Sequence, residues 1–171
     1  MRYLTGYPAD TLAQVQRRID ENSLSTLLLQ RYPDAHEVRT DRALYDYVSG
    51  LKNAFLRKAD PLSKVAFDSK LHVIRIALGT HTTVSRVQGS KLKTKREIRV
   101  ASLFKAVPIE WLRMIVVHEL AHMKEREHDK AFYALCRHME PQYHQFEFDL
   151  RLYLTHLDTG GARLWLSADV A

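Results

Sequence analysis

The chain has 171 residues, 46% of them hydrophobic, which is enough to bury one core, so we expect a single domain over residues 1–171. No apolar run approaches the roughly 20 residues that a membrane-spanning helix needs, and the first residues lack the apolar segment of a secretion signal. The single cysteine excludes an internal disulfide and fits a reducing compartment, so we expect a cytoplasmic protein without a membrane partner. The net charge of +6 favours an anionic partner.

Helices are expected throughout residues 1–60. Apolar residues at mostly helical spacing run from Thr11 to Leu29, with a break at Glu21–Ser23. A second apolar stripe begins at Asp41, a good N-cap residue, and continues to Arg57. Pro61 closes this segment, so we interpret residues 1–60 as a helical N-terminal extension of the domain.

Short β-rich runs follow between Lys64 and Ala101. They read KVAFD, LHVIRIAL, TTVSRV and EIRVA, and turn-forming residues separate them. We expect these runs to form a small antiparallel or mixed sheet.

Three further helices are expected after the strands. The segment IEWLRMIVVHELAHM, which follows Pro108, is apolar around its whole circumference and must therefore be buried. Asp129 would cap the next helix, KAFYALCRHM, and the last one runs from Tyr143 to about Leu157. The predicted fold class is α+β, with a small sheet packed on a buried helix, N-terminal helices and a helical C-terminal part.

The buried helix carries two histidines at a chelating distance. Residues four apart lie on one face of a helix, so His118 and His122 can direct both imidazoles at a single point. Glu119 lies roughly 100° around the helix from His118 and can reach a water bound to the same ion, so it is the predicted general base. Burying these groups in so apolar a helix would be costly unless a metal ion satisfied them. The pattern therefore predicts a metal site.

His128 is the expected third metal ligand. A continuous helix would turn it away from His118, but a helix that ended early would place it in a bend before a new helix capped by Asp129. Three imidazoles and one open position suit Zn²⁺, so we expect one zinc ion per chain and hydrolytic chemistry, with residues 61–158 forming the sheet and the metal-site helices. The alternatives for the third ligand are Glu147, Glu140 and His138.

The stretch VVHELAHMKEREHDKAFYALCRHMEPQYHQFEFDLRLYL resembles the YgjP-like metallopeptidase family, as do RYPDAHEV, DRALYDYV and ALGTHTTVSRVQGSKLKTKREIRVA. This resemblance implies a small zincin-like fold. It also implies that His118, His122 and His128 are the zinc ligands, and that Glu119 is the catalytic residue.

The substrate has three interpretations. A metallopeptidase is the main one, because a peptide bond is the usual target of this metal constellation and an edge strand could hold an extended peptide. The basic run RVQGSKLKTKRE favours phosphate groups instead, with Arg86, Lys91 and Lys93 as candidate substrate-binding residues. The resemblance also implies a pyrophosphatase that converts UTP to UMP and diphosphate, which is the first alternative. The second alternative is a nucleic-acid-binding module with a structural zinc, which is less favoured because a closed zinc site has four protein ligands and needs no base.

The group that stabilises developing negative charge in a hydrolytic reaction cannot be assigned from the sequence. The candidates by residue type are Tyr133, Tyr143, His138 and Arg86.

Overall fold

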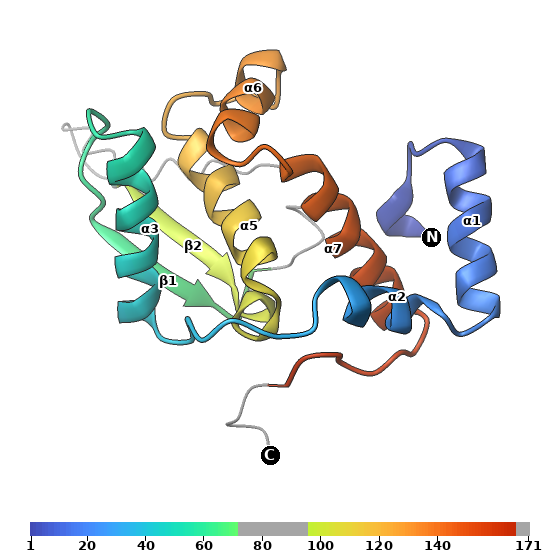
Figure 1. Ribbon diagram of the computed structural model, residues 1–171. Coiled ribbons are helices and arrows are strands. Elements are labelled where there is room, and N and C mark those ends of the chain that lie inside the picture. Colours follow the sequence, from blue (N-terminus) through green and yellow to red (C-terminus); the bar gives the residue numbers. More distant parts are fainter. Residues whose placement is uncertain (72–95, 167–171) are drawn as a thin grey trace.

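The computed structural model describes residues 1–71 and 96–166 (Figure 1). In chain order the elements are η1 (Arg2–Leu4), α1 (Ala9–Asp20), α2 (Leu24–Arg31), α3 (Asp41–Phe55), β1 (Lys64–Asp68), β2 (Glu97–Ala101), η2 (Ser102–Ala106), α5 (Ile109–Ala121), α6 (Lys130–Met139) and α7 (Tyr143–Asp158). The expected α+β class is confirmed. None of the helices in the described ranges combines the length and hydropathy needed to cross a bilayer.

The two described strands pair in parallel, with Lys64 opposite Glu97 and Asp68 opposite Ala101. The expectation of antiparallel pairing is wrong for these strands. Residues 69–96 separate them, and a connection of this length permits the crossover that parallel strands require, whereas only sequential strands joined by short turns must run antiparallel. Of the predicted runs at residues 71–78 and 82–87, all but Leu71 lies outside the described residues.

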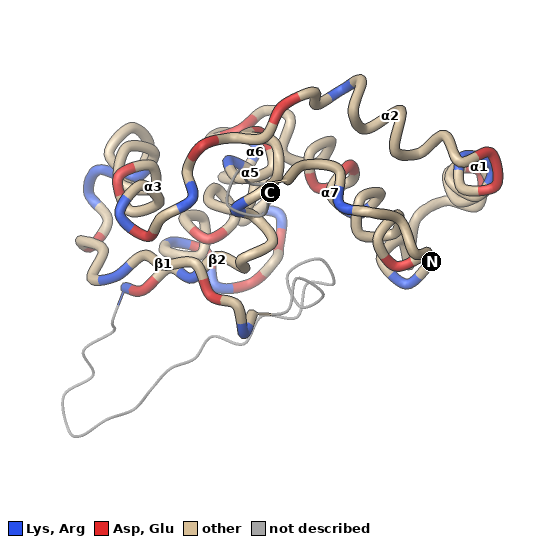
Figure 2. Tube along the Cα trace, turned by 90° about the horizontal axis from the view of Figure 1, so that it is seen from below, with Lys and Arg blue, Asp and Glu red and all other residues tan. Residues whose placement is uncertain are grey.

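Helix α5 lies at the centre of the packing. Helices α3 and α5 cover the same face of the two strands, and α7 flanks α5 on the side away from α3 (Figures 1 and 2). Trp111 on α5 is fully buried and contacts the rings of Tyr32, Tyr153 and Trp165. The prediction that this helix is buried on all sides is confirmed. Ile109 is its one exposed residue, and Glu110, Arg113 and Glu119 are only partly exposed.

The N-terminal helices begin and end close to the predicted positions. The expected break in the first apolar stripe separates α1 from α2, and Asn22 in this break adopts a left-handed φ of 52°. The N-cap of α3 is Thr40, whose hydroxyl accepts a hydrogen bond from the Ala43 amide at 3.1 Å, and not Asp41 as predicted. The Asp41 carboxylate instead accepts the Phe67 amide at 2.9 Å, which ties β1 to α3.

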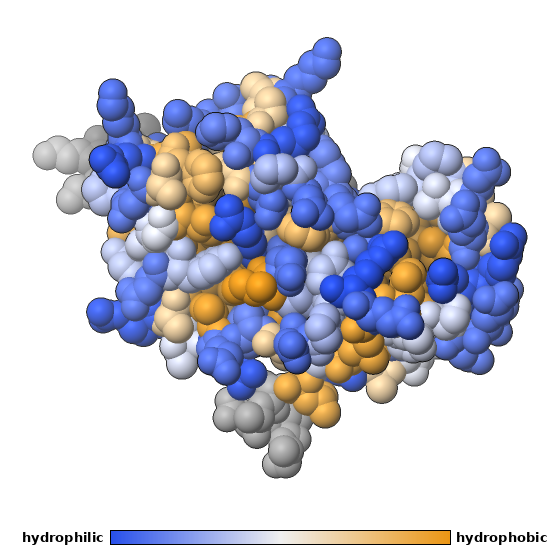
Figure 3. All heavy atoms as spheres, in the orientation of Figure 1, coloured by the Kyte–Doolittle hydropathy of each residue, from blue (hydrophilic) through white to orange (hydrophobic). Residues whose placement is uncertain are grey.

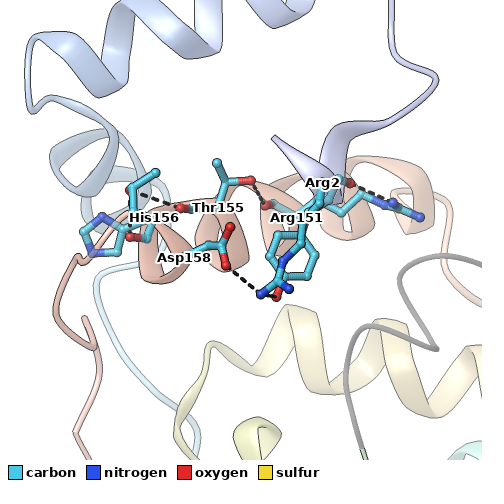
Figure 4. A network of polar contacts seen from close by, with 7 residues as sticks. Arg2, Arg151, Thr155, His156 and Asp158 are labelled. Carbon is cyan, nitrogen blue, oxygen red and sulfur yellow. Dashed lines mark hydrogen bonds and ion pairs between the residues drawn. The ribbon is translucent and has the colours of Figure 1, made fainter.

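Polar contacts hold the N-terminus of the chain against α7 (Figure 4). Arg2 pairs with Asp158 at 2.6 Å, and the Arg151 guanidinium donates to the Tyr3 carbonyl at 2.8 Å. Residues 1–60 therefore contact the C-terminal helix as well as the sheet, and their description as an extension of the domain stays a prediction.

The surface carries both signs of charge and scattered apolar areas. Figure 2 shows Lys and Arg interspersed with Asp and Glu along the described chain, and Figure 3 shows that hydrophilic residues divide the apolar areas on the face it presents. Among the described residues, the large hydrophobic side chains with substantial exposure are Met1, Leu29, Tyr45, Ile109 and Leu166.

A buried carboxylate joins α7 to α2. Asp149 is fully buried and accepts hydrogen bonds from the Tyr32 hydroxyl at 2.6 Å, the Arg31 guanidinium at 2.8 Å and the Gln145 amide at 3.0 Å. Burial, followed by the hydrogen bond and the negative charge of Asp149, raises the pKa of the Tyr32 hydroxyl.

Replacing Asp149 with alanine should lower the free energy of unfolding by about 3 kcal/mol, because it leaves a buried hydroxyl and a cation without their acceptor. Urea denaturation at neutral pH measures this loss. Asp158→Ala is the control, since it removes a more exposed pair with Arg2 and should cost less than about 1 kcal/mol. Equal losses in the two variants would contradict the assigned importance of Asp149.

Candidate metal centre

The end of α5 keeps its two histidines on one face. Ala121 is the last helical residue, and His122 follows as the C-cap with φ −66° and ψ −13°, which are still helical values. The His122 amide donates to the His118 carbonyl at 3.3 Å. The helical spacing that the sequence analysis assumed therefore extends through His122.

His128 lies in a bend between two helices, as expected. Helix α6 begins at Lys130, and its N-cap Asp129 accepts the Phe132 amide at 2.9 Å. Before the bend, the Glu125 amide still bonds to the Ala121 carbonyl at 2.9 Å. This arrangement turns the chain so that His128, directly before the cap, faces back toward α5.

The three imidazoles converge through their Nε2 atoms. The Nε2 atom of His122 lies 3.3 Å from that of His118 and 3.0 Å from that of His128. Nitrogen ligands at about 2.0–2.1 Å from a tetrahedral ion lie about 3.3 Å from one another. The histidine atoms that could coordinate an ion all lie within 4.8 Å of one another, so the donor set fits a single metal ion.

The opposite nitrogens of two rings have hydrogen-bond partners. Nδ1 of His122 lies 2.9 Å from the Glu125 carbonyl, which can only accept, so this nitrogen donates and Nε2 keeps its lone pair. Nδ1 of His118 lies 2.7 Å from the Tyr143 hydroxyl. A partner on the far nitrogen is the usual means of fixing a ligating histidine.

Phe132 packs against the three histidines and was not predicted as a site residue. It is fully buried, and its ring centroid lies 5.0, 4.4 and 4.8 Å from those of His118, His122 and His128. Its only signal in the sequence was its place among the apolar residues of α6, which any core residue shares. Its contact with all three imidazoles arises from the bend.

The alternative third ligands are engaged elsewhere. The carboxylate of Glu140 pairs with Arg113 at 3.3 Å, and that of Glu147 pairs with Arg151 at 2.8 Å. His138 is exposed and meets the Phe55 ring edge-on, with 5.7 Å between centroids. Of the expected ligands, the structure brings together His118, His122 and His128.

Glu119 directly follows His118 on α5 and is half-buried. Burial raises the pKa of its carboxyl to about 7. A cation held by the neighbouring histidines would oppose this shift, because it favours the charged carboxylate.

The position of Tyr143 corrects one expectation about the site. Its hydroxyl contacts Nδ1 of His118, on the side of that ring away from the cluster, so it holds the histidine and is not placed to stabilise charge on a substrate. Burial is the largest cause that raises the pKa of this hydroxyl, followed by the charge of Glu147. Tyr133 is half-buried with its ring centroid 6.2 Å from that of His128, and it stays a candidate for that role.

The predicted phosphate-binding residues lie mostly beyond the described ranges. Arg86, Lys91 and Lys93 fall in residues 72–95, so their role stays a prediction. Arg96, at the end of the same basic run, is described and pairs with Asp60 at 3.0 Å.

The converging imidazoles of His118, His122 and His128 are typical of a protein that binds one metal ion through three histidines. A family model described as YgjP-like, metallopeptidase domain, matches residues 73–153. A curated relative, the UTP pyrophosphatase of Escherichia coli (strain K12), is 59% identical over 160 residues, which cover 94% of this chain and 96% of that protein. The chain belongs to the YgjP-like family. No solved structure matches it significantly.

These comparisons overturn the main interpretation of the sequence. The relative bears the name of an enzyme that acts on a nucleotide, so they support an enzyme, but the prediction of a metallopeptidase acting on peptides is wrong. The metal constellation and the expected edge strand led to that prediction. Neither identifies the substrate, because a hydrolytic metal site activates water in the same way for several kinds of bond. The alternative that the sequence analysis kept, a nucleotide pyrophosphatase, agrees with the relative's name.

Replacing His128 with alanine should weaken metal binding by more than about 100-fold, since losing a ligand costs more than losing a partner behind one. Inductively coupled plasma mass spectrometry of the dialysed protein measures its metal content and tests this expected loss. His138→Ala is the matched control on α6 and should retain its metal. Normal metal content in the His128 variant would show that another residue completes the site.

The cap of α6 should also affect the centre. Asp129→Ala removes the acceptor of the Phe132 amide, which should lower the free energy of unfolding by about 1 kcal/mol and loosen His128. We expect weaker zinc binding in a chelator competition assay, whereas Asp129→Asn keeps an acceptor and should bind nearly as the wild type does. Identical zinc affinities in the wild type and both variants would show that the helix cap does not influence metal binding.

Proposed function

We propose that this chain is a zinc-dependent nucleotide pyrophosphatase that hydrolyses UTP to UMP and diphosphate. The observation that carries the proposal is the convergence of three imidazole Nε2 atoms, with the half-buried Glu119 next to His118 in the sequence. The name of the 59% identical relative supports the substrate. We further propose that the fold is zincin-like and forms one domain.

The donor set favours zinc. Imidazole nitrogens suit Zn²⁺, whereas Mg²⁺ prefers carboxylate and phosphate oxygens, and the cluster contains His118, His122 and His128 without a carboxylate. When bound there, zinc would supply a Lewis acid for a phosphoryl oxygen and lower the pKa of a water to about 7.

Glu119 would act as the general base. Its carboxylate accepts a proton from the attacking water while the water oxygen forms a bond to the α-phosphorus. The bond from this phosphorus to the oxygen that bridges to the β-phosphorus breaks, and the bridging oxygen leaves with diphosphate. UMP keeps the oxygen that came from water.

Cationic side chains would hold the polyphosphate. Arg86, Lys91 and Lys93 are our candidates, because guanidinium and ammonium groups donate several hydrogen bonds to phosphate oxygens. A nucleic-acid-binding module with a structural zinc is less well supported. Such a site uses four protein ligands, and the cluster found within residues 1–71 and 96–166 has three.

The test is UMP and diphosphate release from UTP by zinc-loaded protein and by its Glu119→Gln variant. The variant should keep its zinc and lose at least about 100-fold in kcat, because general bases contribute factors of this size. Glu110→Gln, at the other end of α5, is the control and should retain activity.

Two outcomes would contradict the proposal in different ways. Full activity in the Glu119 variant would remove that residue from the mechanism. Zinc-loaded wild-type protein that leaves UTP intact would overturn the substrate assignment itself.

A further inference from the structure

Tyr143 connects α7 to the back of the metal centre. It is the first residue of α7, its side chain is 1% exposed, and its hydroxyl lies 2.7 Å from Nδ1 of His118 on α5. The two rings are nearly parallel, with an interplanar angle of 16°. The contact is therefore buried, and it joins two helices that are not adjacent in the chain.

The chemistry of the two groups gives this hydrogen bond a direction. Nε2 of His118 points at the other histidines and must keep its lone pair to bind a metal ion, so the ring proton lies on Nδ1. Nδ1 then donates, and the Tyr143 oxygen accepts. The hydroxyl proton stays available to a further acceptor.

We infer that Tyr143 is a positioning residue, which fixes the tautomer and the ring orientation of His118 and thereby sets the affinity of the centre for its metal ion. The inference rests on the proposed metal-binding function of the three histidines. Partners of this kind behind a ligating histidine typically change metal affinity by 10- to 100-fold. A neutral hydroxyl withdraws the Nδ1 proton less than a carboxylate would, so it leaves His118 a weaker electron donor and the bound ion a stronger Lewis acid.

The test must separate this role from packing, because Tyr143 also belongs to the core. Tyr143→Phe keeps the ring and removes only the hydroxyl. Tyr153→Phe is the matched control, since Tyr153 is also 1% exposed on α7 but packs against Trp111 and Trp165. Both variants lose one buried hydroxyl from the same helix.

Metal binding is read in two ways that need no substrate. Zinc affinity is measured by competition with a chromogenic chelator, and the visible absorption of the Co²⁺-loaded protein reports the geometry around the ion. We expect Tyr143→Phe to bind zinc 10- to 100-fold more weakly with an altered Co²⁺ spectrum, and Tyr153→Phe to match the wild type in both. Wild-type affinity and an unchanged spectrum in Tyr143→Phe would overturn the inference.

A second measurement covers the case in which Tyr143→Phe does not fold. Long-range ¹H–¹⁵N NMR correlations of the zinc-loaded wild-type protein report which ring nitrogen of His118 carries the proton. We expect the proton on Nδ1, where the Tyr143 hydroxyl can accept it, and a proton on Nε2 of His118 would overturn the inference. Wild-type protein that binds zinc but does not hydrolyse UTP would refute the proposed substrate while leaving these metal-binding results interpretable.

Discussion

The fold is arranged around the convergence of three imidazole nitrogens, in which Nε2 of His122 lies 3.3 Å from that of His118 and 3.0 Å from that of His128. Neutral imidazoles whose lone pairs face one another gain nothing from the contact, and a cation between them turns the same contact into coordination. The buried α5 supplies two of the rings at fixed spacing. The bend before α6 supplies the third, and α7 contacts the back of the first through Tyr143.

Local sequence rules predicted much of this site. Helical periodicity placed His118 and His122 together, and the capping preference of Asp129 indicated where α6 would begin, which put His128 in the bend. Both rules act within a few residues. Thr40 and Asp41 show their limit, since both residues can cap a helix and only the packed structure assigns Asp41 to the Phe67 amide.

Features that depend on distant parts of the chain could not be predicted in the same way. The parallel pairing of β1 with β2 depends on the path of the connection between them, and the hydrogen bond from Tyr143 depends on how α7 packs against α5. Tyr143 was considered for its hydroxyl, but its partner is set by tertiary contacts. The substrate prediction was wrong because the residues that activate water do not determine which bond the water attacks.

The bend between α5 and α6 is made without glycine and, within the described residues, Asn22 is the one non-glycine residue with a left-handed φ. Residues 124–127 therefore turn the chain in ordinary conformations, and their unfolded forms have less entropy to lose than a glycine-rich loop would. With Asp129 and Phe132 already holding the turn, the centre is preorganised. For the proposed metal centre, a turn held by these contacts lowers the conformational entropy that ordering the three histidines around an ion would cost.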